Sequence, residues 1–427
     1  PSTRPPLVDF ANLITKGNSL LICGHVMKGT HSQRVHEALT LKALRWLDQH
    51  RIKAFMSIVE EGSGSFETAA QALMQITGLG KLKPNTVLIG YKSDWQTCPR
   101  EDLEQYFNLI HTALDSYLAV GILRLRHGLD YSASIQDKDV VMISSLDKKD
   151  REDKMRRNQS GAQLALDELD QAAANMIESN VDPTIEIEIP PVTFEVQNED
   201  FTFNTKDNKG HDMYLNPDGE PLTPQLLNEL THFRKKQDKG FIDVWWLYDD
   251  GGLSLLIPHI LSTRSQFADC KLRIFSLANR KNQLDRDQRN LAALLSKFRI
   301  DYSDLIVIPD IAKKAKEETR AEFESFIQSF REKRNSKQDC KGSQEEKCIL
   351  ESELLTLNEK TNRHMRLREL LLQYSLHSTF VVMTLPMPRK GTVSAPVYMA
   401  WLELLTKDLP PYLILRGNQT SVLTYYS

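Results

Sequence analysis

Hydrophobic and polar positions alternate in two ways along the first 130 residues. Short runs that are almost continuously apolar predict strands at residues 19–26, 52–59, 85–91 and 117–126. Segments between them repeat apolar residues every three or four positions, which predicts helices at residues 35–47, 66–78 and 103–114. Strands that are apolar on both faces and alternate with helices indicate a parallel sheet with helices on both sides.

The same pattern returns after residue 240. Apolar runs predict strands at residues 241–249, 270–277, 301–310, 378–385, 411–417 and 421–427. Helical spacing predicts helices at residues 253–262, 289–298, 313–334, 351–374 and 395–405. The chain is therefore expected to contain a second α/β half.

Composition changes sharply between the two halves. Residues 147–157, DKKDREDKMRR, are a dense mixed-charge run, and the residues before 240 are rich in turn formers. We therefore predict a first α/β lobe at 1–130, a charged and largely flexible linker at 131–239 with a short helix at about 162–177, and a second lobe at 240–427. A polar gap is expected at about 335–350 within the second lobe.

Overall composition excludes several classes of protein. The formal net charge of the 427 residues is −3, too small a field to attract nucleic acid or anionic lipid. No apolar run approaches the roughly 18 to 20 residues that cross a bilayer. The five cysteines form no C-x-x-C pair, which favours reduced thiols in the cytosol, and Cys340 and Cys348 are expected to be free surface thiols. The chain lacks an initiating Met and is expected to be part of a longer polypeptide.

One loop is a candidate nucleotide site. Gly24, Lys28 and Gly29 lie where the first strand passes into the first helix, which is where α/β sheets bind ligands. Thr30 stands where the lysine of a phosphate-binding P-loop belongs, so the motif is incomplete. A bland connecting turn is the competing interpretation.

The corner Asp249-Asp250-Gly251-Gly252 also follows an apolar strand. Its carboxylates would repel phosphate, and no third ligand for Mg²⁺ is evident nearby. A structural turn with a helix cap is the favoured interpretation.

Other patterns point away from catalysis. His36-Glu37 begins like a zinc-protease motif, but Thr40 occupies the position of the second histidine ligand. No G-x-S-x-G elbow or complete dinucleotide fingerprint occurs, so the chain is not expected to be an enzyme. Basic residues at 362–368 are expected to remain in water while leucines of the same helix pack, with docking onto an acidic partner as the alternative.

Several long segments resemble the cytoplasmic carboxy-terminal domain of the cation-chloride cotransporters. In the second half these are IDVWWLYDDGGLSLLIPHIL, LLSKFRIDYSDLIVIPDI and VVMTLPMPRKGTVSAPVYMAWLELLTKDLPPYLILRGNQTSVLTYYS. In the first half they are RPPLVDFANLITKGNSLLICGHV, RIKAF, GLGKLKPNTVLIGYKSDW and GLDYS. The ending RGNQTSVLTYYS and the DVWWLYDDGG core are similar to the sodium-dependent branch, most of all to Na-K-2Cl cotransporters, with the Na-Cl cotransporter as runner-up.

The resemblance implies a fold of two tandem Rossmann-like lobes, comparable to universal stress proteins. It implies a cytosolic domain, on the plasma membrane in the full-length protein, that forms a homodimer and contacts the transmembrane domain of the same polypeptide. Regulatory kinases and phosphatases would act on the parent transporter, and the fragment itself would transport nothing. Some relatives bind adenine nucleotide in the first lobe, so ATP is a candidate ligand and a nucleotide-binding switch is the alternative function.

Two tryptophans are candidate interface residues. Trp245 and Trp246 follow each other in a predicted strand, so one is expected to face each side of the sheet. If one of those sides is an interface, a tryptophan there is a suitable anchor.

Overall fold

The computed structural model describes residues 1–62, 64–135, 214, 216, 220–248, 250–278, 284–309, 311, 313–331 and 349–423. These residues divide into two units by their contacts. The first unit comprises Pro1–Thr30, Glu37–Ser134 and Thr223–Ser427, and the second comprises His31–His36 and Ile135–Leu222. The helix expected at about 162–177 and most of the polar gap lie outside the described residues. Both sheets belong to the first unit.

The first half contains the predicted alternation of strands and helices. Its elements are β1 (Ile22–Met27), α2 (Gln33–Gln49), β2 (Phe55–Glu60), α3 (Phe66–Ile76), β3 (Thr86–Gly90), α4 (Arg100–Asp115) and β4 (Ala119–Arg124). β1 and β2 pair in parallel as a two-stranded sheet, and β3 pairs in parallel with β4. α3 is preceded by the N-cap Ser65, whose side chain and backbone exchange hydrogen bonds with Thr68 in a capping box.

The second half forms a five-stranded parallel arrangement. Its strands are β5 (Gly240–Trp246), β6 (Cys270–Leu277), β7 (Asp304–Ile308), β8 (Phe380–Thr384) and β9 (Tyr412–Arg416). Its helices are α7 (Leu253–Ser262), α8 (Leu284–Lys297), α9 (Glu317–Ile327), α10 (Glu351–Ser375) and α11 (Ala395–Thr406). The strand order β7-β6-β5-β8-β9 is that of doubly wound α/β folds, which confirms the predicted fold class.

The two halves share one sheet. β4 pairs antiparallel with β9, so the order of the larger sheet is β3-β4-β9-β8-β5-β6-β7. We call the β4–β9 pairing the seam. Gly121 of β4 allows a close approach there, because a Cβ at that position would lie 3.1 Å from side-chain atoms of both Leu88 and Leu415. The limits of the two lobes stay a prediction, but their strands are joined across the predicted boundary.

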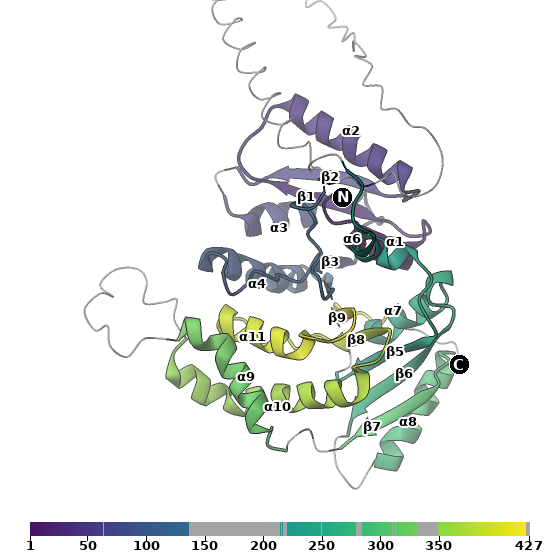
Figure 1. Cartoon of the computed structure of the whole chain (residues 1–427), viewed down its shortest axis with the longest axis vertical. Helices are drawn as coiled ribbons and strands as arrows, with labels where there is room; N and C mark the ends of the chain where they lie inside the picture. Colours follow the sequence, from purple (N-terminus) through teal and green to yellow (C-terminus); the bar gives the residue numbers. More distant parts are fainter. Residues whose placement is uncertain are drawn as a thin grey trace, which may run out of the picture. The chain divides into compact units, whose positions relative to one another are not determined.

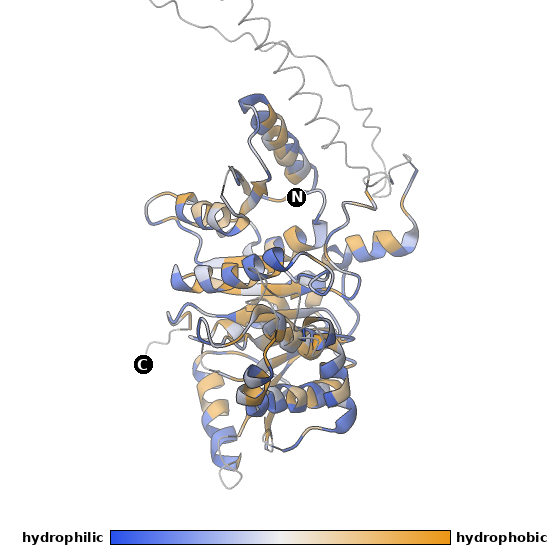
Figure 2. Cartoon of the chain, turned by 90° about the vertical axis from the view of Figure 1, so that its left-hand side faces the viewer, coloured by the Kyte–Doolittle hydropathy of each residue, from blue (hydrophilic) through white to orange (hydrophobic). Residues whose placement is uncertain are grey.

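Helices cover both faces of the larger sheet (Figure 1). The buried core on one face includes residues of α4, α9, α10 and α11, and the core on the other includes residues of α1 (Pro5–Thr15), α7 and α8. Figure 2 shows helices on which hydrophilic and hydrophobic residues alternate, as expected for amphipathic elements. In the described part of the chain, none of the helices combines the length and apolarity that a bilayer span requires.

The end of the predicted linker is folded and packed. Two short elements of this segment contact α1: α6 (Pro224–Leu230) and a 3-10 helix (His232–Arg234). The apolar pattern of the sequence did not predict α1. The Arg234 guanidinium donates to both carboxylate oxygens of buried Asp9 at 2.8 and 2.9 Å. Residues 223–239 therefore belong to the first unit, whereas the limits of the predicted linker stay a prediction.

Two further sequence predictions need correction. A strand is expected at 421–427, but its described residues, 421–423, form none; the Val422 N–H instead donates to the Gly251 carbonyl at 2.9 Å. On α10 the leucines pack as expected, but the cation of Arg368 is buried at 3 % exposure rather than solvated. The acidic partners of Arg368 lie within the chain itself.

Candidate functional site

The three candidate nucleotide residues have different surroundings. Gly24 lies within β1 paired with Ser57, and a Cβ there would lie 2.5 Å from a methyl carbon of Leu73 on α3. The packing of β1 against α3 therefore explains why this position is a glycine. Lys28 and Gly29 follow the carboxyl end of β1; Gly29 has φ +81° and open space around its Cβ position. These two residues remain a candidate ligand loop.

The glycine-rich corner after β5 is closed by the chain that follows β9. Asp250 accepts hydrogen bonds from the Gly252 and Ser254 amides at 3.2 and 3.1 Å, so it caps the start of α7. A Cβ on Gly251 would lie 2.3 Å from the Thr420 carbonyl oxygen, and one on Gly417 would lie 1.8 Å from that of Asp250. The corner is structural, as expected; Asp249 lies outside the described residues.

The two tryptophans of β5 face opposite sides of the sheet, as predicted. Trp245 is 0 % exposed, stacks on Phe275 at 4.6 Å and donates its indole N–H to Ser375 at 3.0 Å. It belongs to the chain's own core, so its assignment as an interface anchor is wrong. Trp246 is half-buried against the other core, and an interface role for it stays a prediction.

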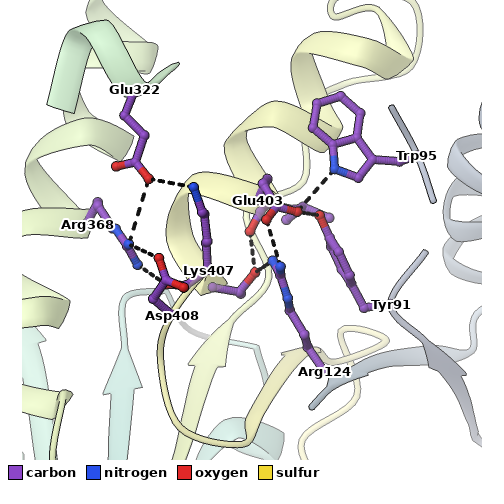
Figure 3. Close-up of polar contacts among 10 residues, drawn as sticks. Tyr91, Trp95, Arg124, Glu322, Arg368, Glu403, Lys407 and Asp408 are labelled. Atoms are coloured by element: carbon purple, nitrogen blue, oxygen red, sulfur yellow. Dashed lines mark hydrogen bonds and ion pairs between the residues drawn. The ribbon is translucent and has the colours of Figure 1, made fainter. Parts of the chain in front are cut away.

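A buried polar network lies beside the seam between β4 and β9. We call it the Glu403 cluster: Tyr91, Trp95, Arg124 and Glu403, which Figure 3 labels, together with Thr406. Glu403 Oε2 accepts from Tyr91 Oη at 2.6 Å and Trp95 Nε1 at 3.1 Å. Its Oε1 accepts from Arg124 at 2.7 Å, and Arg124 also donates to the Thr406 hydroxyl at 2.5 Å. Residues from both halves are thus joined through one carboxylate.

Local structure explains how these side chains meet. Tyr91 directly follows β3, and its backbone N–H donates to the Leu123 carbonyl of β4 at 2.9 Å. Arg124 is the last residue of β4 and lies over the Tyr91 ring at 4.2 Å. Glu403 lies in the last turn of α11, and its carboxylate reaches these strand ends. The end of the strands and the end of the helix therefore define one site.

Electrostatics favour the charged form of Glu403. Burial by itself would raise the pKa of this carboxyl, but the Arg124 charge and the hydrogen bonds from Arg124, Tyr91 and Trp95 outweigh it and lower the pKa below its ordinary value. Burial, with a smaller contribution from Glu403, raises the pKa of Tyr91 well above its ordinary value, so the phenol remains a donor. Hydrogen bonds to a charged acceptor are stronger than those between two neutral groups.

A second network adjoins the first along α10 and α11. We call it the Arg368 cluster: Glu322, Arg368, Lys407 and Asp408 (Figure 3). Arg368 lies 4.0 Å from Glu322 and 3.8 Å from Asp408, and it donates to the Lys407 carbonyl. Lys407 lies 3.4 Å from Glu322. Burial lowers the pKa of Arg368, and the two carboxylates oppose that effect. This network ties α9, α10 and the turn before β9 together.

The two clusters connect helices and strands through hydrogen bonds and ion pairs. A general base needs an acceptor position open toward a substrate, whereas both Glu403 oxygens already accept hydrogen bonds from fixed groups. Within the described ranges, no group of three or more His, Cys, Asp or Glu side chains could hold a metal ion. Cys23, Cys98 and Cys270 are free thiols. The clusters therefore join elements of the fold.

The sequence analysis missed the Glu403 cluster, although a signal was present. Glu403 is the one charged residue in the helix APVYMAWLELLT, which is otherwise apolar or hydroxyl-bearing. A lone carboxylate on a helix that is apolar all round requires a buried partner. The partner, Arg124, is 279 residues away in sequence, and only the fold identifies it.

Comparison with known proteins finds relatives of this sequence. The profile of solute carrier family 12 matches residues 4–427. The bumetanide-sensitive sodium-(potassium)-chloride cotransporter of Manduca sexta is 43 % identical over 433 residues, which is 100 % of this chain and 40 % of that protein. Human solute carrier family 12 member 2 is 39 % identical over 438 residues, again 100 % of this chain but 34 % of the relative.

A solved structure is also similar, more distantly. The cytoplasmic domain of a prokaryotic cation chloride cotransporter aligns over 94 % of this chain and 98 % of its own, with a TM-score of 0.37 and 8 % identity. The chain spans between 34 % and 40 % of the length of the relatives named above. On the family match over nearly its whole length, the chain belongs to solute carrier family 12.

Proposed function

We propose that this chain is the cytosolic regulatory and dimerisation domain of an electroneutral sodium-potassium-chloride symporter. The observation that carries the proposal is its 43 % identity, over its whole length, to part of a sodium-(potassium)-chloride cotransporter. In this proposal the chain does not transport ions or catalyse a reaction. It contacts the transmembrane domain of the same polypeptide, forms a homodimer, and relays the action of regulatory kinases and phosphatases.

The seam between the halves supports a relay role. The shared sheet and the Glu403 cluster connect the two halves through close-packed and hydrogen-bonded contacts. In this proposal, a shift of the strands in one half therefore shifts the strands of the other. A partner bound to either half could therefore influence contacts made by the other half. Trp246 is the remaining candidate anchor for the homodimer.

A chimera tests the regulatory role. The matching region of human solute carrier family 12 member 2 is either deleted or replaced by this chain, and chloride-dependent rubidium uptake is measured with surface delivery quantified. We expect deletion to abolish or deregulate uptake and replacement to restore it. A matched replacement carrying Arg124→Leu, which breaks the Glu403 cluster, should restore uptake less. Full uptake after deletion, with an unchanged response to hypertonic shrinkage, would refute the proposal.

The Na-Cl cotransporter alternative differs only in the parent protein. Rubidium uptake by the full-length protein supports the sodium-potassium-chloride assignment. Chloride-dependent sodium uptake without rubidium uptake supports the alternative.

An adenine-nucleotide switch is a second candidate function. It is favoured by one observation: Gly29 has positive φ and open space at the carboxyl end of β1, beside Lys28. Titration of the chain with labelled ATP tests it, with Lys28→Met as the variant that should weaken binding. Absence of saturable binding at millimolar ATP excludes this function.

A further inference from the structure

The turn between α3 and β3 presents apolar side chains to solvent. Leu79 is 82 % exposed, Leu82 is 70 % exposed, and Ile76 at the end of α3 is 62 % exposed. Tyr117, which lies two residues before β4, is 76 % exposed. Because β3 and β4 pair in parallel, their amino ends lie at the same edge of the sheet, and these four residues border that edge. We call them the amino-end patch.

The backbone of this turn keeps both leucines away from the core. Leu79 and Leu82 exchange two backbone hydrogen bonds of 2.9 Å each, which close the turn. Gly78 has φ +101°, and a Cβ there would lie 2.5 Å from the Leu82 carbonyl oxygen, so only glycine fits. Neither leucine belongs to the buried core. Large apolar side chains that are gathered and held in solvent indicate an interaction surface.

The charges closest to these leucines in the sequence are positive. Lys81 and Lys83 flank Leu82, both are exposed, and neither forms an ion pair within the described part of the chain. The sequence from 68 to 93 contains no Asp or Glu, and Asp115 is the carboxylate that precedes Tyr117. The net charge of −3 of the whole chain therefore does not describe this turn, where cations alternate with apolar side chains.

We propose that the amino-end patch docks onto a membrane surface that contains anionic lipids. Leu79 and Leu82 enter the boundary between headgroups and acyl chains, and the Tyr117 ring lies at the level of the headgroups. Lys81 and Lys83 contact the anionic headgroups. Charge complementarity favours this occupant, because a lipid surface offers acyl chains to the leucines and negative charge to the lysines beside them.

The docking surface rests on the proposed function in one respect, namely the tether that would keep this chain beside a membrane. Two leucines, one tyrosine and two lysines give only a weak affinity for lipid. A tether raises the effective concentration of the patch at the membrane, so a weak affinity is sufficient. The affinity itself belongs to the chain and is measured without any transport.

Sedimentation of the whole chain with lipid vesicles tests the proposal. The vesicles consist of phosphatidylcholine alone or of phosphatidylcholine with about 30 % phosphatidylserine, which supplies the negative charge of a cytoplasmic leaflet. We expect the chain to partition onto the anionic vesicles about tenfold more strongly than onto the neutral ones, because two lysines gain anionic partners. Added salt should remove this difference by screening.

Paired substitutions separate the apolar from the charged contribution. Leu79→Ser combined with Leu82→Ser removes apolar contact from exposed positions, and it should lower partition onto anionic vesicles about tenfold. Lys81→Gln combined with Lys83→Gln should reduce it to the level of the neutral vesicles. Leu355→Ser on α10, where the leucine is 75 % exposed, is the matched control and should leave partition unchanged.

Three outcomes would overturn the docking surface. They are no partition onto anionic vesicles, unchanged partition in the paired leucine variant, and an equal loss in Leu355→Ser. Sedimentation equilibrium without lipid adds a fourth: if the paired leucine variant dissociates a dimer while vesicles do not bind, the patch covers a second copy instead. Rubidium uptake has no part in these assays, so failure of docking leaves the proposed function standing.

Discussion

Glu403 accepts hydrogen bonds from three side chains of the first half of the chain. It is a charged group on a buried helix, and its side chain is only 12 % exposed. Its hydrogen bonds reach the strand ends of the first half while its backbone belongs to the second. A change of charge at this one position therefore affects the joint between the halves.

We expect Glu403→Gln to lower the free energy of unfolding by about 3 kcal/mol, because it leaves the partly buried Arg124 cation without its partner. The matched control is Glu317→Gln, which removes a carboxylate that is 80 % exposed and 3.9 Å from Arg320. That control should change stability by no more than about 0.5 kcal/mol. Urea unfolding of both variants checks this, and equal effects would contradict the assigned role of Glu403.

The pH dependence of the same variant gives a second readout. The pKa of Glu403 is lower in the folded chain than its ordinary value of 4.5, so the unfolded chain binds more protons in the interval between them. The stabilisation is complete above pH 4.5 and is lost as the pH falls through the folded pKa. The stability difference between wild type and Glu403→Gln should therefore shrink below pH 4.5.

At the scale of elements, the segment after β9 acts as a clamp on the corner that begins α7. Gly417 is in contact with the backbone of Asp250, and the Val422 amide is hydrogen-bonded to Gly251. The corner thus depends on a segment more than 160 residues later in the chain.

Gly417→Ala should detach this clamp, because the added Cβ would lie 1.8 Å from a backbone oxygen that cannot move aside easily. Hydrogen exchange of residues 417–423 should accelerate, with loss of protection at the Val422 amide. Gly64→Ala is the control: its added Cβ would lie 2.7 Å from the Thr68 hydroxyl, so it should disturb the capping box of α3 and leave exchange at residues 417–423 unchanged. Unchanged exchange in Gly417→Ala would show that the close contact is not maintained in solution.

Helices and strands could be predicted where the sequence pattern that specifies them lies within the element itself. The helix at Leu253–Ser262 and the strand at Cys270–Leu277 match the predicted limits because their apolar runs and flanking turns are local. The seam between β4 and β9 could not be predicted, because a strand's apolar pattern does not specify its neighbour. Arg368 was misjudged for a related reason: its acidic partners come from other elements, and helical periodicity contains no information about them.

At the scale of the whole molecule, the shared sheet predicts that the two halves lose structure together. Leu413 in β9 is 0 % exposed and pairs with Leu123 on one side and Val382 on the other. Its truncation should weaken both halves at once.

We expect Leu413→Ala to cost about 2 to 5 kcal/mol. Hydrogen exchange should accelerate by the same factor in β3 and in β6, which lie on opposite sides of the seam. Leu355→Ala on α10, where the side chain is 75 % exposed, should change neither. Acceleration confined to β6 would mean that the halves unfold independently.

The position of β9 also has a consequence during protein synthesis. β9 is the last strand of the described chain, yet it lies between β4 and β8 inside the sheet rather than at its edge. The ribosome synthesises the amino-terminal part first. The edges of β4 and β8 that pair with β9 therefore stay unpaired until residue 416 has emerged. The nascent chain is therefore exposed to aggregation late in translation, and a premature stop before Tyr412 would remove the strand that unites the sheet.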